Sequence, residues 1–150
     1  MSQRQRWEEK AFAIAESIAS TTSQIDSLCR SRSARDMLIK TLDRGGIMQT
    51  KDEDSDPYVE KIKESISRML AINSELESEF RTLVKVVSQK FGELSLYLDN
   101  ASHRTSRAFH NAIVDYVARV DSEDAVAVQN EFNYQQDEFR KAMRGHFSIE

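Results

Sequence analysis

One stretch of the sequence, from Val59 to Tyr97, repeats at alternating intervals of three and four positions, and every position of the repeat except Asn73 and Lys90 is apolar. In an α-helix this spacing puts every member on one face, which is the pattern of helices that pack along their whole length. A strand is excluded, because side chains of a strand alternate with a period of two. The stretch therefore predicts one long helix over residues 57–98, with these positions forming its seam: Val59, Ile62, Ile66, Met69, Asn73, Leu76, Phe80, Leu83, Val87, Lys90, Leu94 and Tyr97.

The predicted helix over 57–98 has a clear start and a second apolar stripe. Asp56 is a favoured residue at the N-cap, and Pro57 suits the first helical position. Gly92 marks a point where another backbone could approach closely. The second stripe widens the apolar face, which indicates that more than one partner helix covers it; it consists of Leu70, Val84, Phe91 and Leu98.

Residues 3–44 contain a similar stripe that changes character near its end. It runs through Trp7, Ala11, Ile14, Ile18, Thr21, Ile25 and Leu28. Arg32 and Arg35 interrupt it, and it resumes on a shifted face at Ala34, Leu38 and Leu42. Either the helix rotates its contact there, or it breaks near Ser31–Ser33. Gly45 follows where a left-handed C-terminal cap is expected, and residues 45–56 are predicted to form a loop.

The last part of the chain, residues 102–144, is again helical in pattern. Within it, residues 121–124 (Asp-Ser-Glu-Asp) resemble an N-cap and an acidic first turn. The region is therefore either one kinked helix or two helices divided near Ser122. The 150 residues include only four glycines and one proline, too few for the turns of a β-rich fold. We predict a single all-α domain over residues 1–150: an antiparallel bundle of three long helices, or four if the third is split, with coiled-coil-like packing.

Charge is unevenly distributed along the chain. The net charge of −4 argues against a general nucleic-acid binder. Residues 30–44 hold five basic and two acidic residues, whereas residues 121–138 hold six acidic residues and no basic one. These segments are either two solvated helix faces or a positive and a negative contact surface. Arg30, Arg32 and Arg35 are candidate partner contacts, and the stretch Arg30–Arg44 would serve a nucleic-acid-associated subunit.

Residues that could carry chemistry are few. The three histidines form no Glu-x-x-His or His-x-x-x-His pair, so we expect no metal site, and no phosphate-binding loop or cofactor motif is present. Cys29 is the only cysteine and sits in a helical apolar pattern, where a buried thiol in a reducing, cytoplasmic setting is expected. No apolar run has the length of a membrane span.

Two resemblances bear on function. Arg104-x₅-His110 resembles the Arg-x₄₋₆-His motif of HEPN ribonucleases, which implies that Arg104 would steady phosphate charge and His110 would act as acid or base. Thr105 departs from the Asn, Asp or His that usually follows the arginine, and Asp115–Tyr116 lacks the histidine of the family's His-x-Tyr ending. The last segment also resembles the final, Phe- and Gln-rich helices of the N-terminal regulatory bundles of syntaxins. The residues that carry this resemblance are Phe109, Tyr116, Phe132, Gln135, Gln136 and Phe139.

Long apolar seams without a chemical motif favour a non-enzymatic interaction module, such as an adaptor, complex subunit, chaperone or inhibitor. Its partner would be another protein or a second copy of the chain. Asn73 in the seam either fixes helix register or lies at a bend or hydrated gap. Ile47 and Met48 in the first loop either cap the end of the bundle or dock onto a partner. The alternatives are a HEPN-like ribonuclease or degenerate relative and a nucleic-acid-associated subunit.

Overall fold

The structure, a computed structural model, describes residues 2–49 and 56–147 as four α-helices and one short 3-10 helix. In chain order these are α1 (Gln3–Leu42), η1 (Ile47–Gln49), α2 (Pro57–Ser95), α3 (Asn100–Arg119) and α4 (Ala125–Phe147). No strand occurs in these residues, which confirms the predicted all-α bundle. Of the two alternatives for residues 102–144, the division near Ser122 is the one observed.

Local hydrogen bonds explain two of the helix boundaries. The Asp56 carboxylate accepts a hydrogen bond from the Tyr58 backbone N–H at 3.0 Å, and Pro57 occupies the first turn of α2, as the sequence predicted. After α3, the Ser122 hydroxyl donates to the carbonyl of Arg119 at 2.8 Å. This bond satisfies a carbonyl that has lost its helical partner, so it stabilises the end of α3.

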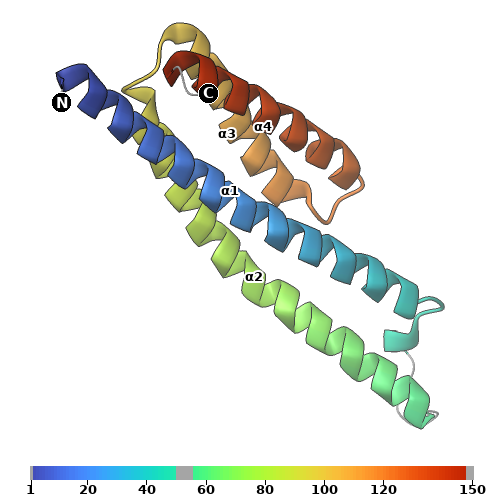
Figure 1. Ribbon diagram of the computed structural model, residues 1–150. Coiled ribbons are helices and arrows are strands. Elements are labelled where there is room, and N and C mark those ends of the chain that lie inside the picture. The colour runs from blue at the N-terminus through green and yellow to red at the C-terminus, as the bar shows by residue number, and fades with distance from the viewer. Residues whose placement is uncertain (1, 50–55, 148–150) are drawn as a thin grey trace.

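Two of the helices are about twice as long as the other two (Figure 1). α1 and α2 contain 40 and 39 residues, whereas α3 and α4 contain 20 and 23. α1 and α2 run antiparallel, and the α3–α4 hairpin packs against the half of them that holds the start of α1 and the end of α2. We call this the covered half, residues 3–29 and 73–95. The remainder of the pair, residues 30–44 and 57–72, is the uncovered half.

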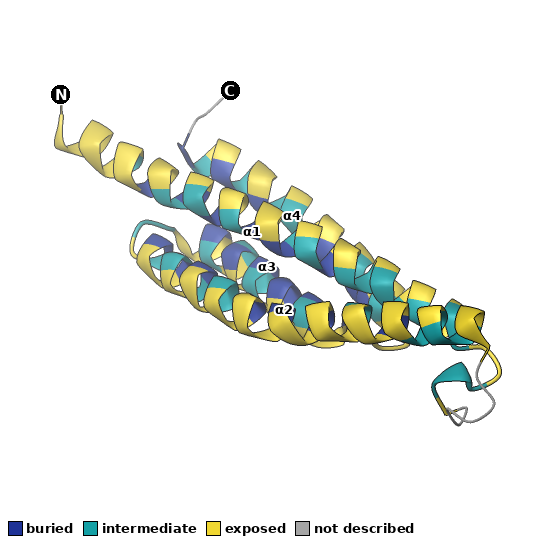
Figure 2. Cartoon of the chain, turned by 90° about the horizontal axis from the view of Figure 1, so that it is seen from below, coloured by how far each residue is buried: buried dark blue, intermediate teal, exposed yellow. Residues whose placement is uncertain are grey.

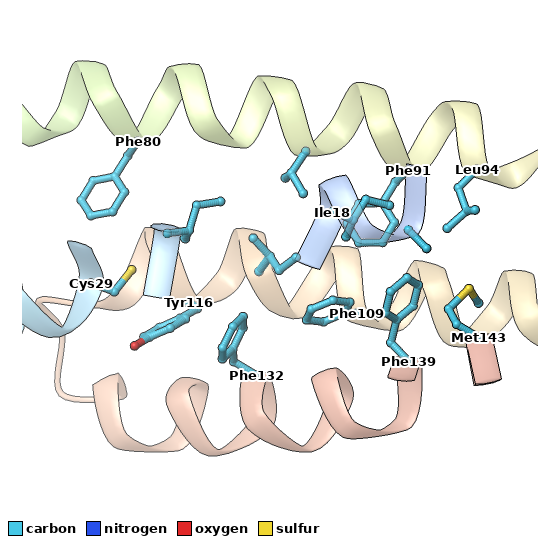
Figure 3. Packing of buried hydrophobic residues seen from close by; sticks show 14 of the residues in the cluster. Ile18, Cys29, Phe80, Phe91, Leu94, Phe109, Tyr116, Phe132, Phe139 and Met143 are labelled. Carbon is cyan, nitrogen blue, oxygen red and sulfur yellow. The ribbon is translucent and has the colours of Figure 1, made fainter. Parts of the chain in front are cut away.

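The main core lies in the covered half, where side chains of all four helices meet (Figure 3). One phenylalanine from each of three helices joins there: Phe91 of α2, Phe109 of α3 and Phe139 of α4. The ring centroids of Phe109 and Phe139 are 5.0 Å apart, and those of Phe91 and Phe109 are 5.8 Å apart. Aromatic pairs at these distances add about 1 kcal/mol each beyond their buried area. This cluster therefore fixes the α3–α4 hairpin against α2.

The seam predicted along α2 is observed from Val59 to Leu94, but the helix ends at Ser95 rather than at residue 98, so Tyr97 lies in the turn that follows. None of its twelve positions is exposed, and six are buried: Ile66, Asn73, Leu76, Phe80, Val87 and Leu94. The expectation for Gly92 was wrong, because a Cβ at this position would meet no atom within 4 Å. No neighbouring backbone approaches there, and the side of α2 at Gly92 is open.

α1 continues without a break through Ser31–Ser33, so the predicted alternative of a broken helix was wrong. The stripe also does not move to a new face, since Ala34 and Leu38 are exposed. Arg32 and Arg35 instead stay half-buried on the side of α1 that faces α2. Charged residues are tolerated in the seam because each finds a polar partner across it, as described next.

Candidate functional site

Most residues of the uncovered half are exposed or half-buried (Figure 2), and several of the exposed ones are large and apolar. Between residues 30 and 49 no residue is buried, and between 57 and 72 only Ile66 is. Met37 is 70% exposed, and Leu38 and Leu70 are each 48% exposed. Consecutive helical residues are about 100° apart around the axis, so Met37 and Leu38 point to different faces of α1. Exposed apolar residues mark a surface that another molecule covers where they share one face.

Leu70 shows why these side chains are exposed. It belongs to the second apolar stripe of α2, together with Val84 and Phe91. Phe91 is only 5% exposed because α3 and α4 pack over it, and Val84 is half-buried in a groove against α3. Leu70 lies two heptads before Val84 on the same face, where neither α3 nor α4 reaches. The stripe thus continues beyond its partner helices.

A cavity marks the step between the two halves. It has a volume of about 270 Å³. Its α1 side includes Ala34 and Met37, and its other side includes Val120 of the α3–α4 turn and Ala125 and Gln129 of α4. A helix placed end to end with the α3–α4 hairpin would lie on Met37 and fill this step.

A polar junction separates the covered from the uncovered half. Asn73, which is only 6% exposed, donates from Nδ2 to Oδ1 of Asp36 at 2.8 Å and accepts at Oδ1 from Nε of Arg35 at 2.8 Å. Burial raises the pKa of Asp36, and the nearby Arg32 guanidinium opposes that rise. Both hydrogen bonds join α2 to α1 and need one axial alignment of the two helices. Of the two readings of Asn73, the geometry matches a register-fixing residue.

The arginines singled out in the sequence are all engaged within the chain. Arg30 pairs with Asp26 at 3.0 Å, and Arg35 with Asn73 as above. Arg32, whose side chain is 15% exposed, pairs with Asp121 of the α3–α4 turn at 3.0 Å. The basic stretch Arg30–Arg44 and the acidic stretch that begins at Asp121 therefore meet at this point. Nucleic-acid binding by these arginines stays a prediction.

The uncovered half is nevertheless strongly basic. It contains eight basic and four acidic residues, a net charge of +4 in a chain whose net charge is −4. Lys40, Arg44, Lys61 and Arg68 are exposed within it. Arg68 lies 3.7 Å from Glu64, a surface pair of small energetic weight. Lys40 lies three residues after Met37 and therefore on its side of α1, whereas Lys61 and Arg68 lie on the side of α2 opposite to Leu70.

Ile47 and Met48 lie at the far end of the uncovered half. Gly45 and Gly46 have φ angles of +81° and +76°, which turn the chain back towards α2. The Met48 backbone N–H then donates to Oδ1 of Asp43 at 2.9 Å. Both apolar side chains are half-buried where η1 packs on α2. This placement matches the capping alternative more closely than a freely exposed docking residue.

Arg104 and His110 share α3 but are not brought together by it. Six residues of a regular helix place them about 120° apart around its axis. His110 is half-buried: its Nε2 lies 2.8 Å from Ser88 Oγ, and its ring stacks on Phe91 with centroids 4.8 Å apart. Arg104 is exposed. The arginine that lines a cavity with His110 is Arg107, which the sequence reading missed although its spacing from His103 signals a shared helix face.

Other kinds of site find little support in the part of the chain that the structure describes. No group of three or more His, Cys, Asp or Glu residues there could hold a metal ion. None of the described helices is long and apolar enough to cross a membrane. Cys29 is fully buried, and burial raises the pKa of its thiol to about 12. In comparisons with protein families, curated proteins and solved structures, nothing matches this chain.

Proposed function

We propose that this protein is a non-enzymatic helical interaction module, whose uncovered half binds an acidic, amphipathic helical segment of another protein. One observation carries the proposal: the apolar stripe of α2 continues at Leu70 past the end of the α3–α4 hairpin, and Met37 of α1 is 70% exposed at the cavity beside that end. A helix bundle gains stability by covering such stripes. The partner helix would take, in the uncovered half, the place that α3 and α4 take in the covered half.

Charge supports the choice of an acidic partner. The uncovered half carries a net charge of +4, and exposed Lys40 lies three residues after Met37 on the same side of α1. Complementary charge accelerates encounter and rejects partners of the wrong sign. A second copy of this chain, docked through the same surface, would place two such positive surfaces together, which disfavours a symmetric dimer there.

The size of the surface sets the expected strength. Thirteen helical residues of α1 span roughly 20 Å, and two adjacent helices are roughly 20 Å wide, so the face measures on the order of 400 Å². A standard interface buries about 800 Å² on each partner. We therefore expect a transient complex with a dissociation constant on the order of micromolar.

The test compares substitutions at matched exposure. Met37→Gln with Leu70→Gln removes apolar contacts from the uncovered half, and Val126→Gln is the control, because Val126 is 70% exposed like Met37 but lies on α4. A photo-cross-linking residue placed at 37 or at 126 in cells would identify neighbours. We expect cross-linking at position 37, but not at 126, to capture a protein that contains an acidic helix. This protein should bind the purified double variant at least tenfold more weakly than it binds the wild-type chain.

Three results would contradict the proposal. Equal capture at positions 37 and 126 would show that the uncovered half has no special affinity. Unchanged affinity of the double variant for the captured protein would show that Met37 and Leu70 are not contacts. Cross-links only between two copies of the chain would show that the partner is a second copy and not an acidic helix of another protein. Light scattering would then measure the oligomeric state.

A further inference from the structure

A second cavity, between α2 and α3, is lined by polar side chains where helix packing usually places apolar ones. Its volume is about 240 Å³, and we call it the α2–α3 cavity. That space corresponds to about eight waters at their volume in the liquid, and it is smaller than most pockets for drug-sized ligands. The cavity therefore suits a small ligand.

The lining residues are spaced so that two polar rows face each other. On α3, His103, Arg107 and His110 follow the spacing of four and then three that places side chains on one face. On α2, positions 88, 92 and 95 follow the same spacing and hold Ser, Gly and Ser. The Ser88–His110 contact of 2.8 Å shows that the two rows meet. Phe91 also lines the cavity, and its ring stacks on that of His110.

Gly92 lines the α2–α3 cavity without a side chain. A Cβ at this position would meet no atom within 4 Å, and its φ angle is not in the left-handed region, so alanine would fit without strain. Glycine inside a helix costs about 1 kcal/mol relative to alanine. The fold therefore carries a cost here that neither packing nor backbone conformation explains, at a position that lines the cavity together with Arg107.

The chemistry of the lining selects an anion rather than a cation. None of the described residues that line the cavity is acidic, whereas an arginine, two histidines and three serines do line it. Within residues 2–49 and 56–147, no carboxylate pairs with Arg107. A guanidinium with free donors beside imidazole N–H and hydroxyl groups matches the acceptor oxygens of phosphate.

We propose that the α2–α3 cavity binds a small oxyanion of the phosphate class, either inorganic phosphate or a phosphate monoester. Arg107 supplies the charge-assisted hydrogen bonds, and His103 and the Ser106 hydroxyl complete the coordination. Ser88 is already bonded to Nε2 of His110, and the Ser95 hydroxyl donates to the Gly92 carbonyl. The proposal rests on different residues from the proposed function, because the uncovered half lies at the other end of α2. It requires neither Arg104 nor any reaction at the bound group.

The test is a titration of the full chain, followed through the imidazole resonances of its histidines by NMR. The probes are inorganic phosphate and ribose 5-phosphate, added at constant ionic strength set with sodium chloride. We expect saturable shifts of the His103 and His110 resonances and no shift of His146. The dissociation constant should be in the millimolar range or below, which corresponds to a binding free energy on the order of −4 kcal/mol or more favourable. Tighter binding of ribose 5-phosphate would identify a monoester as the preferred ligand.

Paired variants make the test specific. Arg107→Gln should weaken binding roughly ten- to hundredfold, the value of a lost charge-assisted hydrogen bond. Arg104→Gln is the matched control, since Arg104 is an exposed arginine of the same helix that does not line the cavity, and it should bind like the wild type. Gly92→Ala should raise the unfolding temperature and weaken binding. Linear, non-saturating shifts, or equal losses in both arginine variants, would overturn the proposal.

Discussion

Asn73 offers the sharpest test of how α1 and α2 are aligned. In an Asn73→Ala variant, Asp36 loses a donor and Arg35 loses an acceptor, each at 2.8 Å. A hydrogen bond to a charged group contributes about 1.5–3 kcal/mol, and the lower end applies because both partners are half-buried. Two such bonds amount to about 3 kcal/mol. Alanine returns about 0.6 kcal/mol through its higher helix propensity, which leaves a net destabilisation of about 2 kcal/mol.

Urea unfolding followed by circular dichroism at equal m-values would measure this change. The control is Asn111→Ala, at an exposed position within α3, where we expect only the small gain in helix propensity. A double-mutant cycle with Asp36→Ala should show a coupling of about 1 kcal/mol, because the two residues share a bond. If Asn73→Ala were as stable as the wild type, or if the two changes were additive, Asn73 would lie in a hydrated gap and would not fix the register.

Three further predictions follow from buried groups and from the uncovered half. Burial and the hydrogen bond from its hydroxyl to Asp26 (2.9 Å) raise the pKa of Tyr116. The folded state then holds this proton more tightly than the unfolded state, so stability should fall as the pH rises above about 10, and less so in Tyr116→Phe, measured by urea unfolding. Cys29, with its thiol pKa raised to about 12, should resist iodoacetamide at pH 8 until the chain unfolds, as mass spectrometry would show; rapid labelling of folded protein would contradict its burial. Backbone amides of residues 30–42 and 57–72 should exchange hydrogen faster than those of the covered half, and uniform protection would contradict the difference in packing.

The course of α2 follows closely from residue spacing. Every seam position between Val59 and Tyr97 is at least half-buried, and Pro57 starts α2 as expected. These features are predictable because helix periodicity and capping depend on neighbours within a few residues. The division near Ser122 was one of two alternatives, and the sequence could not choose between them because a kink and a turn use the same polar residues.

The candidate sites were less predictable, because they depend on contacts between distant segments. In the sequence, Arg32 and Arg35 interrupt the apolar stripe. In the structure both stay in the seam, because Asp121 pairs with Arg32 and Asn73 accepts a hydrogen bond from Arg35. Nothing in the sequence pattern marked Met37 as an exposed residue. Its exposure follows only from where the α3–α4 hairpin ends, which is a property of packing.

By itself the sequence determined that this chain forms long helices, where the longest seam lies and which residues begin α2. These outcomes are local, since they arise from the geometry of one helix. Only the tertiary structure decided that α3 and α4 cover half of the longer pair, that the polar junction forms around Asn73, and that Arg107 rather than Arg104 lies beside His110 in a cavity. Those outcomes depend on which distant residues become neighbours, and free energy of packing selects them over the whole chain.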